Sequence, residues 1–209
     1  MPQFGWLIDL DKCTGCDTCS IACKSENNTR PLSSPMPFKN GSSVLPDHVS
    51  YRWVVKKEGG VYPNPSLTFV TSSCNHCKHP ACYEACPVSD QTPETGLFNP
   101  ENAIFKRAED GIVLINQEVC IGCKNCTQSC PYGAPQFNSE TELVEKCTFC
   151  IHRLDAGFLP ACVTTCVGNA LHLVEDFNVD ESGENKPDGF ADPALTVPSV
   201  KFATGPPPP

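Results

Sequence analysis

The cysteines are the residues of this sequence whose type and spacing could do chemistry. Sixteen of the 209 residues are cysteines, and they stand in four groups of four. Thiolates are the ligands that zinc and iron-sulfur clusters prefer. Two groups have the spacing CxxCxxCxxxC, namely Cys13, Cys16, Cys19 and Cys23 and later Cys120, Cys123, Cys126 and Cys130. The other two begin with CxxC and end with CxxxC, namely Cys74, Cys77, Cys82 and Cys86 and later Cys147, Cys150, Cys162 and Cys166.

The groups are copies of two motifs that alternate along the chain. FGWLIDLDKCTGCDTCSIAC aligns with DGIVLINQEVCIGCKNCTQSC, which sets Gly15 on Gly122. SSCNHCKHPACYEAC aligns with EKCTFCIHRLDAGFLPACVTTC, which has seven extra residues. An internal repeat of this kind predicts that one structural unit is used twice.

The first motif points to iron-sulfur clusters. CxxCxxCxxxC followed by proline is the run of bacterial ferredoxins, in which three thiolates bind one cubane and the fourth reaches another cluster. Cys120 to Cys130 followed by Pro131 fits this run in full, whereas Lys24 replaces the proline after Cys23. At four thiolates per cluster, sixteen cysteines make four [4Fe-4S] clusters with none left over. Chain order alone leaves open which cluster each crossing cysteine reaches.

Two other uses of the cysteines fit less well. Structural disulfides need an oxidising compartment and do not account for the CxxC pairs. A zinc-binding interaction module would also use CxxC, with His76, His79 or His152 as nitrogen ligands, but zinc ribbons keep two CxxC pairs well apart. We therefore expect the histidines to be surface residues or neighbours of the cluster ligands.

The elements that position the motifs are short. Residues 4–8 and 112–115 are patterned as strands before the CxxCxxC motifs, and residues 170–174 as a strand after the last motif. Residues 103–115 are typical of a hairpin that turns near Asp110. The CxxxC ends suit single helical turns, because residues four apart share a helix face. No long amphipathic helix is visible, so something besides side chains should fill the interior.

Three segments lie outside the repeats. Residues 24–73, with the stretch RPLSSPMPFKNGSS, and residues 87–102 are not patterned like a core. From Glu175 the chain is acidic and then rich in proline and glycine, a composition that builds no packed core of its own. We expect residues 176–209 to form an extended arm whose apolar side chains enter pockets on a neighbouring subunit, namely Phe190, Leu195, Val197, Val200 and Phe202.

The charge balance limits the partners of the chain. It carries 15 Lys and Arg against 24 Asp and Glu, a net charge of −9. This argues against a nucleic-acid partner, which would need a basic surface. No apolar stretch approaches the ~18 to 20 residues that span a bilayer, and MPQFGWLIDLDKC lacks the features of a signal peptide. We expect a soluble chain without direct membrane insertion, held in the cytoplasm or at a membrane face and exported only with a partner that carries the signal.

The motifs resemble, in their order and residues, the four-cluster iron-sulfur subunit of the dimethyl sulfoxide reductase family of molybdopterin oxidoreductases. The matching stretches are FGWLIDLDKCTGCDTCSIACKSEN, CNHCKHPAC, DGIVLINQEVCIGCKNCTQSCPYGAPQFN and KCTFCIHRLDAGFLPACVTTC. The resemblance covers about residues 1–175 and implies an α+β fold with two bacterial-ferredoxin-like lobes, related as pseudo-twofold repeats. Residues 1–40 with 141–175 would form one lobe, residues 41–140 the other, and residues 176–209 the arm. This chain departs from the family in the insertion VSDQTPETGLFNPEN and in its proline-rich linker after Cys23.

The resemblance also implies a nested pairing, in which the first motif shares a lobe with the fourth and the second with the third. Each lobe would hold two clusters. The four implied ligand sets, termed here the first to fourth cysteine sets, are Cys13, Cys16, Cys19 and Cys166; Cys147, Cys150, Cys162 and Cys23; Cys74, Cys77, Cys82 and Cys130; and Cys120, Cys123, Cys126 and Cys86.

The function implied is that of an electron-transfer subunit with no catalytic residues of its own. Four [4Fe-4S] clusters would relay electrons between a molybdopterin subunit, with molybdenum or tungsten, and a quinone-reactive membrane anchor or another electron partner. The alternative is a polyferredoxin subunit of a hydrogenase or formate hydrogenlyase complex.

Overall fold

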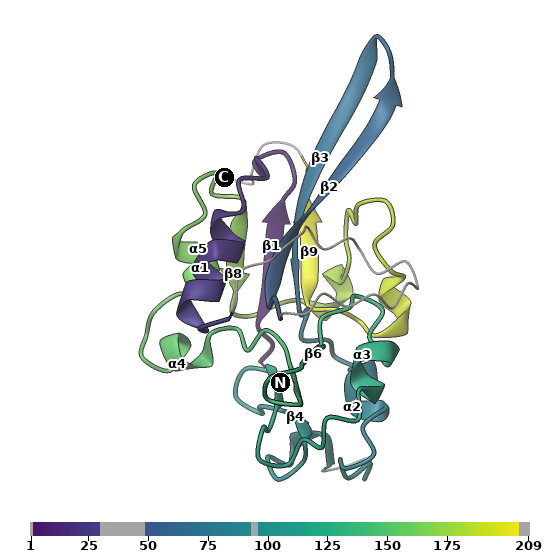
Figure 1. The fold of residues 1–209 in the computed structure, drawn as a ribbon. Coiled ribbons are helices and arrows are strands. Elements are labelled where there is room, and N and C mark those ends of the chain that lie inside the picture. Colours follow the sequence, from purple (N-terminus) through teal and green to yellow (C-terminus); the bar gives the residue numbers. More distant parts are fainter. Residues whose placement is uncertain (1, 30–48, 93–95, 205–209) are drawn as a thin grey trace.

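The computed structural model describes residues 2–29, 49–92 and 96–204 as a mixed α/β chain of mostly short elements (Figure 1). In chain order these are β1 (Gly5–Asp9), α1 (Thr18–Glu26), β2 (Arg52–Val61), β3 (Asn64–Ser73), α2 (Ala81–Glu84), η1 (Gly96–Phe98), β4 (Ile104–Lys106), β5 (Val113–Ile115), α3 (Asn125–Ser129), β6 (Gln136–Asn138), β7 (Leu143–Glu145), α4 (Ile151–Leu154), α5 (Ala161–Thr164), β8 (Leu171–Val174), η2 (Val179–Glu181), η3 (Pro193–Leu195) and β9 (Val200–Ala203).

A three-stranded sheet joins the two ends of the chain. β1 is its central strand and pairs antiparallel with β8, from Gly5 opposite Val174 to Ile8 opposite Leu171. Helices α1 and α5, which carry cysteines of the first and last motifs, pack together beside this sheet (Figure 1). The predicted strands at residues 4–8 and 170–174 are confirmed, and they bring the first motif next to the last.

The hairpin predicted at residues 103–115 is also confirmed. β4 and β5 pair antiparallel, with Lys106 opposite Val113 at the turn end. Gly111 has a φ of +69°, which a residue without a Cβ adopts at little cost. Helices α2 and α3, which carry cysteines of the second and third motifs, contact each other. This contact brings the second motif next to the third.

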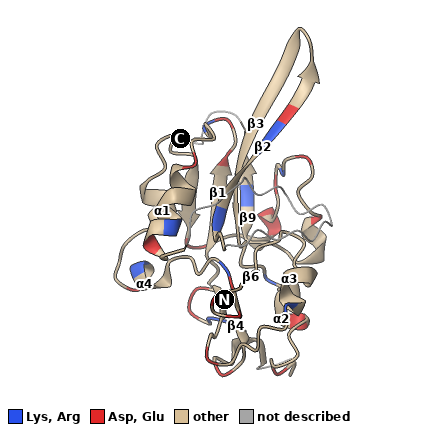
Figure 2. Cartoon of the chain, in the orientation of Figure 1, with Lys and Arg blue, Asp and Glu red and all other residues tan. Residues whose placement is uncertain are grey.

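The linker after the first motif differs from the expectation of a segment without core residues. Residues 30–48 lie outside the described part of the chain, but β2 and β3 that follow form a hairpin paired from Arg52–Ser73 to Val61–Asn64. Trp53 and Val70 at its base are buried in the core. Because the sequence-based prediction grouped these strands with the proline-rich residues before Val49, their pattern of β-branched and aromatic residues was missed. The hairpin projects from the body, and its outer end, residues 59–68, contains no Lys, Arg, Asp or Glu (Figures 1 and 2).

The segment after Glu175 corrects a second expectation. β9 pairs parallel with β1, and Val200 and Phe202 are 0% and 2% exposed within this chain. Phe190 packs on Tyr132, with ring centroids 5.0 Å apart. The prediction that these three side chains enter a neighbour is wrong, because a segment too polar to build a core can still add one strand to an existing sheet. Of the five predicted anchors, Leu195 alone is largely exposed.

Cysteines are built into the apolar core. The larger cluster of buried side chains contains both tryptophans together with Cys19, Cys77 and Cys147, and the smaller one surrounds Cys82 and Cys126. Trp6 stacks on Phe149, with ring centroids 3.9 Å apart. The interior is therefore packed around thiols as well as around aliphatic and aromatic groups.

Candidate metal centres

The two CxxCxxC loops have the same backbone. Gly15 and Gly122 have φ values of +68° and +67°, and a Cβ at these positions would meet Phe69 at 2.2 Å and Glu142 at 2.1 Å. In both copies the residue two positions later, Asp17 or Lys124, also has a positive φ and precedes a helix. In each copy the three cysteines of the loop line a single cavity.

The helices that follow these loops differ in length. α3 ends at Ser129, because Pro131 disfavours helical geometry in the preceding residue and cannot donate a backbone hydrogen bond. Lys24 stands where the second copy has this proline, and α1 continues to Glu26. The missing proline noted in the sequence therefore lengthens α1 without moving its cysteines.

The two CxxC motifs of the other kind meet at equivalent positions. His76 and Phe149, the third residues of CNHC and CTFC, both have positive φ and are both 0% exposed. Their ring centroids lie 4.7 Å apart. His76 Nδ1 accepts a hydrogen bond from the Val113 backbone N–H at 3.1 Å. His76 is therefore a buried neighbour of Cys74 and Cys77, the second of the two positions expected for the histidines, whereas His79 and His152 are exposed.

The structure brings cysteines of different motifs to common cavities. One cavity is lined by the four members of the first set, Cys13, Cys16, Cys19 and Cys166. A second is lined by Cys74, Cys77, Cys82 and Cys130, the third set. Another is lined by Cys86, Cys120, Cys123 and Cys126, the fourth set. In the second set, Cys23 lies close enough to Cys162 and Cys150 for their charges to raise its pKa, after the larger effect of burial.

These donor sets fit a multi-iron cluster. Four sulfurs around one zinc ion, at a Zn–S distance of about 2.3 Å, would lie only ~3.8 Å from one another. Within the described residues, no three His, Cys, Asp or Glu side chains are gathered tightly enough for a single ion. Each of the three cavities is instead lined by four thiols and by apolar side chains. Bound there, [4Fe-4S] clusters would supply one-electron redox chemistry, and the twelve cysteines that line the three cavities would hold them.

The four sets differ in exposure. All members of the second and third sets are buried, whereas Cys16 of the first set and Cys123 of the fourth are exposed. Burial raises the pKa of Cys23 and of Cys126 to about 12. A hydrogen bond from the Thr18 hydroxyl lowers the pKa of exposed Cys16. Buried thiols with raised pKa values become thiolates only when metal binding offsets their desolvation.

Three buried cations near the cysteines were missed by the sequence reasoning. Arg52, Lys106 and Lys146 are 1%, 6% and 3% exposed. The Lys106 ammonium donates to the Cys77 carbonyl oxygen at 3.2 Å, and that of Lys146 donates to the Cys147 carbonyl oxygen at 3.1 Å. For one of them the sequence does indicate burial, since Arg52 stands between Tyr51 and Trp53 at the start of a β-patterned run.

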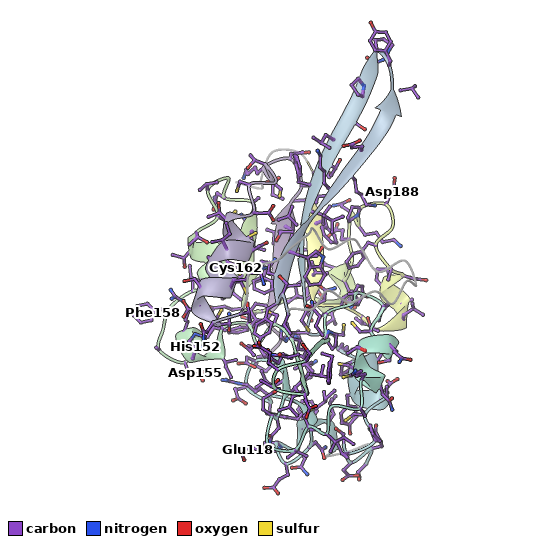
Figure 3. The ribbon with its side chains drawn as sticks, viewed as in Figure 1. Glu118, His152, Asp155, Phe158, Cys162 and Asp188 are labelled. Carbon is purple, nitrogen blue, oxygen red and sulfur yellow. The ribbon has the colours of Figure 1, made fainter. Side chains whose placement is uncertain are left out.

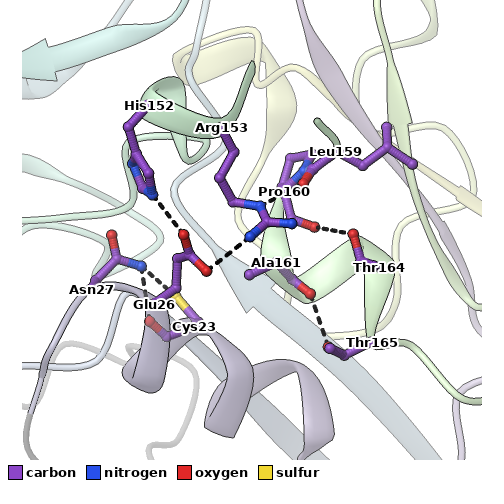
Figure 4. Close-up of polar contacts among 10 residues, drawn as sticks. All are labelled: Cys23, Glu26, Asn27, His152, Arg153, Leu159, Pro160, Ala161, Thr164 and Thr165. Atoms are coloured by element: carbon purple, nitrogen blue, oxygen red, sulfur yellow. Dashed lines mark hydrogen bonds and ion pairs between the residues drawn. The ribbon is translucent and has the colours of Figure 1, made fainter. Parts of the chain in front are cut away.

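The seven extra residues of the last motif contribute to α4 and the loop that follows it, beside the end of α1. Figure 4 shows Glu26 at the centre of the link: it accepts from Arg153 Nη1 at 3.0 Å and lies 2.8 Å from His152 Nε2. Asn27 Nδ2 donates to the Cys23 sulfur at 3.6 Å in the same region. Phe158 at the outer end of the loop is 63% exposed and projects from the body (Figure 3). The insertion therefore encloses one side of the second set.

Comparisons with known proteins agree with this architecture. A family model described as the 4Fe-4S dicluster domain matches residues 65–176. The chain is 39% identical over 168 residues to the B subunit of tetrathionate reductase from Salmonella typhimurium, which covers 80% of this chain and 56% of the relative. It is 32% identical over 233 residues to the beta subunit of perchlorate reductase from Dechloromonas aromatica, covering 84% and 66%. It is 36% identical over 170 residues to the B subunit of anaerobic dimethyl sulfoxide reductase from Escherichia coli, covering 81% and 72%.

This chain therefore belongs to the [4Fe-4S] iron-sulfur subunits of the dimethyl sulfoxide reductase family. It spans 56% to 66% of the length of relatives such as the tetrathionate and perchlorate reductase subunits. Among the residues that the structure describes, no helix is long and apolar enough to cross a membrane.

Proposed function

We propose that this chain is an electron-transfer subunit that relays electrons through four [4Fe-4S] clusters, one in each cysteine set. The observation that carries the proposal is the contrast between the sets: two are wholly buried, and two have an exposed cysteine. A relay needs clusters near the surface, where electrons enter and leave, and buried clusters that connect them. The chain itself would carry out no bond chemistry.

Several helices carry or adjoin cysteines of two sets, and this supports a relay in which the clusters follow one another in the order first, second, third and fourth set. Cys19 and Cys23 on α1 belong to the first and second sets, and Cys162 on α5 and Cys166 just after it belong to the second and first. In the same way, Cys82 on α2 and Cys86 just after it belong to the third and fourth sets, and Cys126 on α3 and Cys130 just after it belong to the fourth and third. The second and third sets approach each other, since the charge of Cys74 contributes to the raised pKa of Cys147, after burial and the charge of Cys23.

The same contacts support two ferredoxin-like lobes, comprising residues 1–40 with 141–175 and residues 41–140. The pairing of β1 with β8 and the packing of α1 on α5 favour the first lobe. The β4–β5 hairpin and the packing of α2 on α3 favour the second. Contact between His76 and Phe149 at equivalent positions is what a pseudo-twofold axis between the lobes would produce.

The named relatives support the proposed partners, because they are subunits of tetrathionate, perchlorate and dimethyl sulfoxide reductases. We propose that one outer cluster faces a molybdopterin catalytic subunit with molybdenum or tungsten. The other would face a quinone-reactive membrane anchor or another electron partner. A polyferredoxin of a hydrogenase or formate hydrogenlyase complex is the alternative outcome.

The test is anaerobic purification of the chain with its native partners. The expected protein is brown, with about 16 iron and 16 acid-labile sulfide per chain, because every ligand set is complete. The large subunit that co-purifies should contain molybdopterin, and a hydrogenase subunit in its place would favour the alternative. Stoichiometric zinc without visible absorption would exclude the electron relay.

A further inference from the structure

Arg52 at the start of β2 is a buried cation without a carboxylate partner. Its guanidinium donates to Thr71 Oγ1 and to Ser73 Oγ, each at 2.9 Å, and lies 4.4 Å over the Trp6 ring. No carboxylate of the described residues forms an ion pair with it, and its Nε has no hydrogen-bond partner there. An arginine is almost never fully buried unless it is paired, because desolvation of its charge costs several kcal/mol. The compensating negative charge has to come from something other than these carboxylates.

Contacts place this cation beside cysteines of two sets. Thr71 Oγ1, which accepts from the Arg52 guanidinium at 2.9 Å, lies 3.4 Å from the Cys19 sulfur and lines the cavity of the first set. The Trp6 ring under the guanidinium belongs to the same core cluster as Cys19, Cys147 and Cys162. Burial raises the pKa of each of the nearby thiols, and the positive charge of Arg52 opposes that rise. The thiols concerned are Cys19 of the first set and all four members of the second set, Cys23, Cys147, Cys150 and Cys162. The guanidinium therefore lies within electrostatic reach of both proposed cluster positions.

We propose that Arg52 is a shared counter-charge for the clusters of the first and second cysteine sets and raises the reduction potentials of both. The inference rests on the proposed function, because it requires clusters in these sets. Reduction adds one electron and one negative charge to a cluster, and a fixed cation in a water-poor interior stabilises the more negative state. Arginine keeps its proton at all accessible pH values, so no proton accompanies this electron. Arg52 acts on the clusters through space and is a positioning and tuning residue.

The fourth set provides an internal reference within the same molecule. Besides its cysteines, its cavity is lined only by apolar residues, among them Ala103, Ile104 and Val144. Cys86 and Cys126 of this set belong to the smaller core cluster, whereas Trp6, which lies under the Arg52 guanidinium, belongs to the larger one. A cluster held there should not respond to changes at Arg52.

The experiment compares variants of the full chain, purified anaerobically with whatever partner accompanies it. Iron and sulfide per chain report loading, and redox titration followed by electron paramagnetic resonance reports the potential of each cluster. Arg52→Gln removes the charge, and Arg52→Lys keeps it without the planar fork. Lys56→Gln removes an exposed charge from the same strand and is the matched control.

Arg52→Gln should retain its clusters and lower the reduction equilibrium constants of the first-set and second-set clusters at least tenfold, about 59 mV for one electron. Arg52→Lys should stay within tenfold of the parent, and Lys56→Gln should not differ from it. Unchanged potentials in fully loaded Arg52→Gln, or an equal shift of all four clusters, would overturn the counter-charge role. If Arg52→Gln loses iron, Arg52→Lys becomes the test of the counter-charge role. A more than tenfold drop in the reduction equilibrium constants of this variant would show that the geometry of the side chain, rather than its charge, sets the potentials. A parent protein without clusters would instead refute the proposed function.

Discussion

The second and third cysteine sets differ from the first and fourth in what surrounds them. The second and third sets are wholly buried and are termed here the inner sets, and the first and fourth are termed the outer sets. Lys106 and Lys146 donate to the carbonyl oxygens of Cys77 and Cys147 of the inner sets. Each outer set leaves one cysteine exposed, Cys16 or Cys123. The same two motifs are used at inner and outer positions, so the spacing of cysteines does not set this difference. Segments outside the repeat reach the sets in different ways: Thr196 of the C-terminal segment lines the cavity of the third set, whereas Val54 and Thr71 of the β2–β3 hairpin line the cavity of the first.

The largest expected effect is the difference between substitutions of two crossing cysteines, Cys23 and Cys166, each of which is the last cysteine of its motif. Cys23 is 5% exposed and belongs to the inner second set, whereas Cys166 is half-buried and belongs to the outer first set. Cys23→Ser should lose the cluster held with Cys147, Cys150 and Cys162 and reduce folded yield. Cys166→Ser should alter only the cluster held with Cys13, Cys16 and Cys19. Iron content and the resonance spectrum of each variant measure the outcome.

That pair of variants also tests the nested pairing. In a sequential arrangement, Cys23 would bind the cluster of Cys74 and its neighbours. A loss of that signal in Cys23→Ser would show that the ligand sets are wrong. Equal loss of yield in both variants would remove the distinction between inner and outer sets.

The C-terminal segment should be necessary for the third set. Thr196 lines the cavity of this set, and its hydroxyl lies 3.0 Å from the Tyr132 hydroxyl oxygen. Phe202→Ala removes a fully buried ring from β9 and should cost on the order of 3 to 5 kcal/mol. The denaturant midpoint, measured without oxygen, should fall, and the third-set cluster should be lost first. Leu195→Ala, at a position that is 66% exposed, is the control, and equal midpoints for the two variants would indicate that the segment is a loosely attached arm.

A smaller difference between the sets is expected in how fast an oxidant and a chelator remove their iron. The exposed sulfurs of Cys16 and Cys123 give solvent a path to the first and fourth sets. Slow treatment with ferricyanide and a chelator should remove iron from these two sets before the buried ones. Spectra taken during the loss identify which clusters disappear. Simultaneous loss from all four sets would mean that global unfolding, rather than local exposure, controls the reaction.

The sequence predicted the metal chemistry and the short strands better than it predicted the packing around them. Cysteine spacing and hydrophobic runs are local, so β1, β5 and β8 could be found from their own residues. The burial of Val200 could not, because it depends on a parallel pairing with β1, nearly 200 residues earlier in the chain. The surroundings of Arg52 could not be predicted either, because its aromatic neighbours in the sequence hint at burial but do not place it beside Trp6 and the cysteines of two motifs.

The smallest expected effect concerns the link between α1 and α4, which encloses one side of the second set. Glu26 lies partly in solvent, so Glu26→Gln should cost only ~0.2 to 1 kcal/mol, as exposed ion pairs do. The hydrogen bond with His152, followed by the charges of Arg153 and His152, lowers the pKa of Glu26 from its ordinary 4.5. A depressed carboxyl pKa contributes stability that is complete above the ordinary value and is lost as pH falls through the folded value. The difference between Glu26→Gln and the parent, measured as the denaturant midpoint, should therefore be present at pH 7 and absent only in strong acid.

Glu118→Gln, at an exposed position away from the link (Figure 3), is the control. A midpoint for Glu26→Gln equal to that control would show that the link does not hold the α4 loop over the second set.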